Sequence, residues 1–154
     1  MKTMRKACFL LFGIAFLLTS CKTYSEKDKE GFDKKIQHFI LQTGEKYEKS
    51  ESGLYYLIEQ EGEGEFIKYT DQVSFTYIGK FLDGTVFDGK NQKTPITYEV
   101  SKLIEGWKEA FTYLKKGGKA KLIIPPYLGY GDHDLPAIPP HSILYFELEI
   151  TNVE

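Results

Sequence analysis

Apolar and polar residues alternate with a period of two along most of the chain after residue 53. In residues 73–81, for example, Val73, Phe75 and Tyr77 share one face, and the residues between them are mostly polar. Such alternation is typical of strands that bury one face. It predicts strands at residues 54–60, 73–81, 85–88, 95–100, 119–124 and 144–151.

One stretch among these strands follows a helical period instead. Ile104, Trp107, Phe111 and Leu114 recur at steps of three and four residues, which predicts a helix within residues 100–118. The lysines at 115 and 116 are expected in its last turn, and the glycine pair at 117 and 118 is expected to end it. Periodicity alone favours a core position for Trp107 over a place in a binding site.

The combination of these elements predicts the fold class. A lone amphipathic helix among strands has to lay its apolar face on their sheet. We therefore predict an α+β fold, a curled antiparallel sheet of five to six strands wrapped over one short helix. A second helical pattern at residues 31–43 predicts a short N-terminal helical extension, and the charged residues 22–30 before it are expected to be a flexible tether.

The first 21 residues have the order of an export signal. Three basic residues precede an apolar run at 7–18, which is shorter than the roughly 20 residues that span a bilayer. The run closes on Leu18-Thr19-Ser20-Cys21, which resembles the lipobox of bacterial lipoproteins. Cleavage before Cys21 would leave this cysteine lipidated as a membrane anchor. The alternative is an ordinary signal peptide with a chance cysteine.

We therefore divide the chain into three parts. These are a lipoprotein signal peptide at 1–20, a lipid-anchored tether with the short helix at 21–52, and one globular domain at 53–154. Of the 2 cysteines, Cys8 would leave with the signal and Cys21 would be acylated, so no thiol would remain. This pattern fits a protein of the bacterial cell envelope, lipid-anchored to a membrane on its extracytoplasmic side.

Charge and motif content exclude several classes of function. The formal net charge of -2 lacks the basic surplus of a nucleic-acid-binding surface. The 3 histidines have no cysteine or glutamate at ligand spacing, so we predict neither a metal site nor a cofactor. The motifs of serine hydrolases, zinc proteases and phosphate-binding loops are missing from the sequence.

The aromatic content, by contrast, calls for an explanation. Aromatic residues make up 15% of the chain, with 11 Tyr and 11 Phe. Rings from separate strands could converge on one concave apolar pocket, although each considered singly fits the core better. A 15-residue loop at 127–141, rich in Gly and Pro, is long enough to indicate a functional role.

Three sequence blocks together resemble one family. They are TYIGKFLDGTVFD (76–88), LIEGWKEAF (103–111), and GYG followed by AIPPHSILYFELEI (129–131 and 137–150). Their order, spacing and residue types are similar to those of FKBP-type peptidyl-prolyl cis-trans isomerases, over residues 73–153. The resemblance implies an FKBP-like fold, with a pocket between helix and sheet that binds a proline ring over the tryptophan.

The resemblance also implies roles for individual residues. The implied catalytic residues are Tyr77, Phe87, Asp88 and Tyr130, with the carboxylate beside the reacting amide and the Tyr130 hydroxyl donating to a substrate carbonyl. The implied substrate-binding residues are Ile96, Leu103, Ile104, Trp107, Ile138 and Phe146. Among these, the Ile104 amide would donate to a substrate carbonyl, Ile138 would close the rim, and Ile96 stands where the family commonly has an aromatic residue.

The sequence thus predicts a membrane-tethered prolyl isomerase that acts on exported proteins. Its expected partners are proline-containing polypeptides and, through Cys21, a membrane. One alternative is a binding module that holds proline-containing segments with little turnover. Another is an envelope scaffold in which the helix at 31–43 docks or dimerises. The oligomeric state stays open, with a monomer as the simpler expectation.

Overall fold

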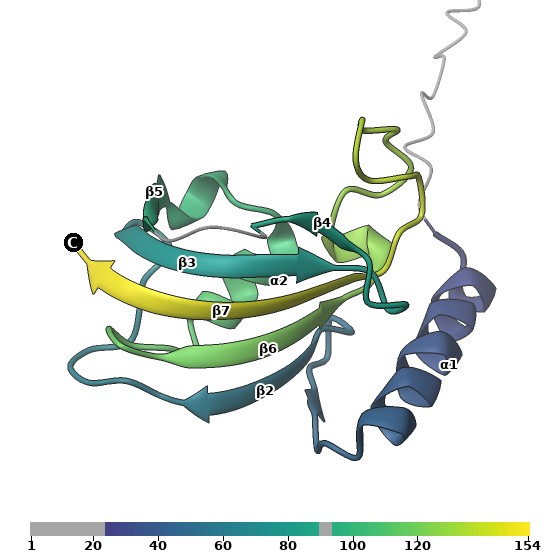
Figure 1. Cartoon of the computed structure of the whole chain (residues 1–154), viewed down its shortest axis with the longest axis horizontal. Helices are drawn as coiled ribbons and strands as arrows, with labels where there is room; N and C mark the ends of the chain where they lie inside the picture. Colours follow the sequence, from purple (N-terminus) through teal and green to yellow (C-terminus); the bar gives the residue numbers. More distant parts are fainter. Residues whose placement is uncertain (1–23, 90–93) are drawn as a thin grey trace, which may run out of the picture.

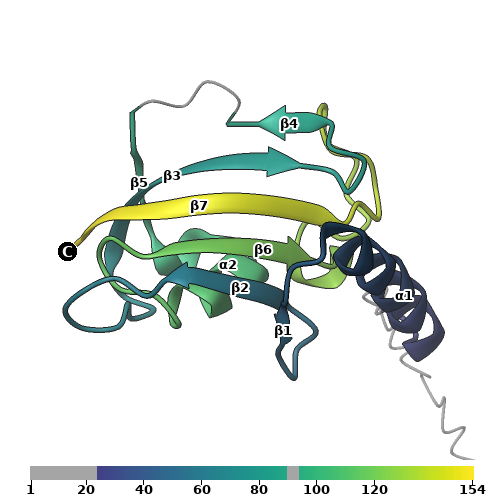
Figure 2. The same cartoon turned by 60° about the horizontal axis from the view of Figure 1, so that its bottom comes forward.

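The computed structural model describes residues 24–89 and 94–154, which form a curled antiparallel sheet with one helix on each face (Figure 1; Figure 2). This confirms the predicted α+β class. The helices are α1 (Glu26–Thr43) and α2 (Glu105–Phe111), with 3₁₀ turns η1 (Val100–Lys102) and η2 (Pro126–Leu128). The strands are β1 (Glu48–Lys49), β2 (Tyr55–Gln60), β3 (Gln72–Lys80), β4 (Val86–Asp88), β5 (Ile96–Glu99), β6 (Lys119–Ile124) and β7 (Leu144–Val153).

The strands lie in the order β1-β2-β6-β7-β3-β4, and β5 pairs with β3. One edge of β3 pairs with β7, while the other edge pairs with β5 at its start and with β4 at its end. The described part of the chain thus has seven strands where the sequence predicted five or six. The additional strand is β1, whose two residues are too few to show an alternating pattern.

Adjacent rows of side chains give the sheet two apolar faces. Leu122 of β6 pairs with Phe146 of β7 in the row that packs with α2. One residue further, Ile123 pairs with Tyr145 in the row that packs with α1. Successive side chains of a strand point to opposite sides, so a single sheet supports both helices.

The helix predicted within residues 100–118 is shorter than its periodicity indicated. The backbone of Ile104 is extended and forms the N-cap of α2, which ends at Phe111. The prediction that the lysines at 115 and 116 lie in its last turn is therefore wrong, and the glycine pair forms the turn into β6 instead. Leu114 is nevertheless fully buried, so the apolar period continues past the helix end.

The N-terminal helix, by contrast, is longer than predicted. Ser25 caps α1 in a capping box, because its hydroxyl accepts from the Asp28 amide and the Asp28 carboxylate accepts from the Ser25 amide. Residues 26–30, expected to be part of a flexible tether, are therefore helical, while residues 22 and 23 lie outside the described part. The box satisfies two backbone donors, which offsets the lack of an apolar period.

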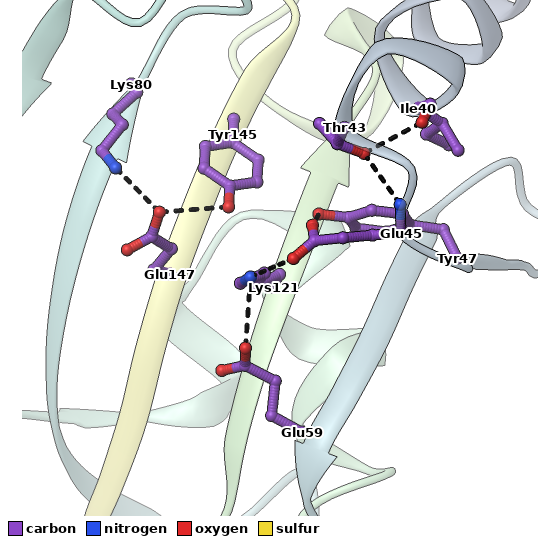
Figure 3. A network of polar contacts seen from close by, with 9 residues as sticks. All are labelled: Ile40, Thr43, Glu45, Tyr47, Glu59, Lys80, Lys121, Tyr145 and Glu147. Carbon is purple, nitrogen blue, oxygen red and sulfur yellow. Dashed lines mark hydrogen bonds and ion pairs between the residues drawn. The ribbon is translucent and has the colours of Figure 1, made fainter.

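Helix α1 packs against the sheet of its own chain. Ile36 is 1% exposed, and it lies in a cluster with Tyr55, Ile123 and Tyr145. Beyond the end of α1, the Lys121 ammonium bonds the carboxylates of both Glu45 and Glu59 (Figure 3). The apolar face of α1 is thus used within the molecule. Neither described helix is long and apolar enough to cross a membrane.

Candidate active site

A cavity of about 330 Å³ lies beside the start of α2, on the face of the sheet that this helix covers. Its volume falls near the lower end of the range for small-ligand pockets, about 300–1,000 Å³. Strands β3, β4, β5 and β7, the segment from η1 to α2, and the loop after η2 all contribute to its walls. The lining residues are Tyr77, Phe87, Asp88, Ile96, Tyr98, Lys102, Leu103, Ile104, Trp107, Tyr130 and Phe146.

Aromatic rings from separate elements hold one another in this wall. The Trp107 ring lies edge-to-face with Tyr77 and Phe146, at centroid distances of 5.1 Å and 4.9 Å. Phe87 lies edge-to-face with Phe146 at 5.7 Å. Each such pair contributes about 0.5–1.5 kcal/mol beyond its buried area. No described residue accepts a hydrogen bond from the buried indole N–H of Trp107, so packing rather than a hydrogen bond fixes its orientation.

A glycine on β3 makes room for this packing. Gly79 pairs with Phe146 on β7 and with Asp88 on β4. A β-carbon at this position would lie 2.7 Å from atoms of the Phe87 ring and 2.9 Å from the Phe146 ring. Both distances are below van der Waals contact, so the two rings can approach β3 only because residue 79 has no side chain.

The polar side of the cavity centres on one carboxylate. The Tyr77 hydroxyl donates to one oxygen of Asp88, and the Gly89 amide donates to the other oxygen at 2.7 Å. Burial, followed by the bond to Asp88, raises the pKa of Tyr77 well above its usual 10. The phenol therefore stays protonated at neutral pH and keeps donating, which fixes the direction of the carboxylate.

Two further donors stand at the cavity. Burial raises the pKa of the Tyr130 phenol, and the nearby Asp88 charge adds to the effect, so this hydroxyl also stays protonated. The Ile104 carbonyl accepts from the Trp107 amide at 3.0 Å, as an N-cap residue does. Its own N–H precedes the helix, and no described residue accepts a hydrogen bond from it.

The structure brings together nine of the ten side chains that the sequence assigned to the site. Ile138 is the exception, because it does not line the cavity. It is 8% exposed, belongs to the main core cluster and bridges to Leu135 within its loop. The role of each residue in substrate binding or catalysis stays a prediction.

Sequence reasoning missed two residues of the lining, Tyr98 and Lys102. Tyr98 could have been found, because it lies two residues after Ile96 on β5 and therefore points to the same side of the strand. Lys102 ends η1, and the single helix predicted there hid this turn. Among the described residues, no three His, Cys, Asp or Glu side chains form a group that could hold a metal ion.

Comparison with known proteins agrees with this geometry. The family model for the FKBP-type peptidyl-prolyl cis-trans isomerase matches residues 63–151. The chain belongs to this family. The match takes in β3 to β6, α2 and all but the last two residues of β7, and therefore every residue that lines the cavity.

Individual FKBP-type relatives extend the similarity. The chain is 44% identical over 108 residues to the isomerase FkpA of Buchnera aphidicola (strain Sg), covering 69% of this chain and 43% of the relative. It is 37% identical over 142 residues to a probable FKBP-type isomerase of Haemophilus influenzae, covering 91% of this chain and 58% of the relative. This chain thus spans about half the length of the curated relatives it matches.

A solved FKBP-type structure supports the fold assignment. The crystal structure of FkpA from Escherichia coli superposes with a TM-score of 0.72 at 36% sequence identity. The match covers 84% of this chain and 62% of the other. Because 84% exceeds the share of the chain that the family model covers, the structural similarity extends beyond the region that the family model matches.

Proposed function

We propose that this protein is a peptidyl-prolyl cis-trans isomerase that is anchored to a membrane through Cys21 and acts on proline-containing segments of exported proteins. One observation carries the proposal of activity. In a chain of the FKBP-type family, an aromatic cavity of about 330 Å³ has Asp88 and Tyr130 in its lining. The anchor rests on the sequence at 18–21, which lies outside the described residues.

The reaction requires a pocket and no covalent chemistry. The barrier to rotation about an amide is about 18–20 kcal/mol, and an unaided Xaa-Pro bond isomerises in tens to hundreds of seconds. Raising the rate from ~10⁻² to ~10² s⁻¹ requires roughly 5.5 kcal/mol of preferential binding to the twisted amide. Such binding has to discriminate between two geometries of the same bond.

The cavity offers three contributions to this discrimination. The planar amide is more dipolar than the twisted one, so the apolar walls around Trp107 disfavour the planar form. The Ile104 amide and the Tyr130 hydroxyl would donate to substrate carbonyls and hold the segment while the bond rotates. The Asp88 carboxylate, fixed by Tyr77, supplies a negative field at the pocket edge. All three contributions come from groups that are already in place.

A proline-peptide isomerisation assay tests the activity. The wild type should exceed the spontaneous rate, Tyr130→Phe should lower kcat/KM about three- to tenfold through one lost hydrogen bond, and Asp88→Ala should lower it further. Tyr69→Phe is the matched control, because Tyr69 is 55% exposed and does not line the cavity. A wild-type rate at the spontaneous level would refute the proposal.

The membrane anchor requires a separate experiment. Changing Cys21 to Ser should move the protein from the membrane fraction to the aqueous fraction. Two or more acyl chains anchor a protein stably, whereas a single chain gives only marginal binding. Continued membrane association of the Cys21→Ser protein would contradict lipidation at this site and would leave the proposed isomerase activity untouched.

A low-turnover binding module is the second candidate, and Ile96 favours it. This residue lines the cavity at a position where an aromatic residue is common in the family, so one wall is less aromatic. For a binding module, proline peptides should bind without appreciable acceleration, and Ile96→Phe should raise turnover. Robust wild-type turnover together with no gain from Ile96→Phe would exclude this candidate.

A further inference from the structure

Tyr24, the first residue that the structure describes, packs on the loop at residues 127–141, which contains Tyr130 and leads to β7. Its ring lies edge-to-face with His141 at a centroid distance of 5.6 Å and within 6.1 Å of the Tyr127 ring. The same ring lies edge-to-face with Phe32 of α1 at 5.4 Å. Tyr24 therefore joins α1 to both ends of the loop at residues 127–141.

A short series of hydrogen bonds runs from Tyr24 to the residue next to Tyr130. The Tyr24 hydroxyl bonds Nδ1 of His141 at 2.8 Å, and the His141 amide donates to the Gly131 carbonyl at 2.8 Å. The Gly131 amide in turn donates to the Pro126 carbonyl at 2.9 Å. The peptide units on either side of Gly131 are thus held from both ends of the loop.

His141 has an unfavourable backbone conformation at its position in this series. Its φ of 61° is the only positive value at a non-glycine residue in the described part of the chain. Such a conformation is unfavourable for a residue with a side chain and persists where surrounding contacts impose it. Its ring contact with Tyr24 and its amide bond to Gly131 are the contacts that favour it here.

We propose that Tyr24 and His141 are positioning residues that hold the Tyr130 hydroxyl in place for catalysis. The proposal rests on the proposed function, in which this hydroxyl donates to a substrate carbonyl. The His133 amide donates to the Tyr130 carbonyl and the Tyr130 ring packs on the core, while the contact to His141 ties the far end of the loop to Gly131. A catalytic donor displaced by about 1 Å can lose much of its effect. The N-terminal extension is therefore part of the support of the active site.

The first test replaces single hydroxyls in the full-length chain, purified in detergent and assayed with a proline peptide. Tyr24→Phe keeps the ring and removes only the bond to His141, and should lower kcat/KM about three- to tenfold. Tyr55→Phe is the matched control. It removes the bond of another tyrosine to Asp33 of α1, at 2.6 Å, without touching the loop, and should leave kcat/KM unchanged.

The second test asks whether the effect passes through Tyr130. In a Tyr130→Phe background the hydroxyl is already missing, so adding Tyr24→Phe should lower kcat/KM less than twofold. His141→Gly keeps the positive φ and should lose as much as Tyr24→Phe. His141→Asn should recover most of the loss, because asparagine tolerates positive φ and carries an acceptor at the δ position.

Three results would overturn the assignment. They are a Tyr24→Phe variant as active as the wild type, losses from Tyr24→Phe and Tyr130→Phe that simply multiply, and an equal loss in Tyr55→Phe. The last result would mean that any loosening of α1 lowers activity. A wild type that shows only the spontaneous rate would instead refute the proposed function, so the two failures are distinguishable.

Discussion

Replacing Gly79 by Ala should damage the cavity without disturbing the backbone. Its φ lies outside the left-handed region, so alanine can adopt the native conformation. The added methyl would lie 2.7 Å from the Phe87 ring and 2.9 Å from the Phe146 ring, whereas ordinary contacts begin near 3.4 Å. At least one ring must therefore move by roughly 0.5–1 Å, and overpacking of this kind costs about 1–3 kcal/mol of stability.

Because both rings line the cavity, the same displacement should reach the chemistry. A shift of about 1 Å in a positioned group can cost up to about a hundredfold in rate, so we expect kcat/KM to fall ten- to a hundredfold. Urea unfolding and the proline-peptide assay measure the two effects on the same protein. The refuting result is a Gly79→Ala protein with wild-type stability and activity, which would mean that the rings adjust without consequence.

A second glycine supplies the control for this substitution. Gly31 lies inside α1 and a β-carbon there would meet nothing within 4 Å. Gly31→Ala should therefore raise stability by about 0.5–1 kcal/mol through helix propensity and leave kcat/KM unchanged. If Gly79→Ala lowers stability while Gly31→Ala raises it, the loss at residue 79 comes from lack of space and not from adding a methyl group in general.

Three further predictions test the site and the docking of α1. Tyr77→Phe should lower kcat/KM about tenfold in the proline-peptide assay, because Asp88 loses the donor that orients it; unchanged activity would contradict that role. The Lys121 bond lowers the pKa of Glu45 below its usual 4.5, so this carboxylate stabilises the fold above about pH 4.5 and loses that effect as the pH falls through its folded value. Glu45→Gln should thus be about 1 kcal/mol less stable at pH 7, with a difference that shrinks in acid; a constant difference in urea unfolding between pH 7 and pH 3 would oppose this. Ile36→Ala should cost about 2–5 kcal/mol of unfolding free energy if α1 and the sheet unfold together, and a loss under 0.5 kcal/mol would show that the helix is dispensable.

The strands were predictable because burial enforces their period. In β6 and β7, alternate residues meet different helices, and both strands lie where the alternation placed them. The first and last residues of the helices were harder to predict from the sequence, because buried positions can continue after a helix has ended. Leu114 continues the apolar period after α2 has ended, whereas the start of α1 depends on the capping box at Ser25 within a charged segment.

The residues of the site were likewise predictable on regular elements and not in irregular segments. Strand and helix residues such as Tyr77, Trp107 and Phe146 come together because regular geometry fixes their directions. Ile138 lies in an irregular loop, where its bridge to Leu135 turns the side chain into the core. A hydrophobic period in the sequence does not indicate such a local pairing. It also does not indicate the short turn η1, at whose end Lys102 lies.

If the proposed anchor at Cys21 is present, the early start of the N-terminal helix sets how far the domain can lie from the membrane. Tyr24 lies three residues after Cys21, and three residue steps span about 10 Å when fully extended. With lipid on Cys21, Tyr24 would be held within that reach of the bilayer surface, and its contacts with the loop would bring the domain with it. The cavity would then act only on segments within a thin layer next to the membrane.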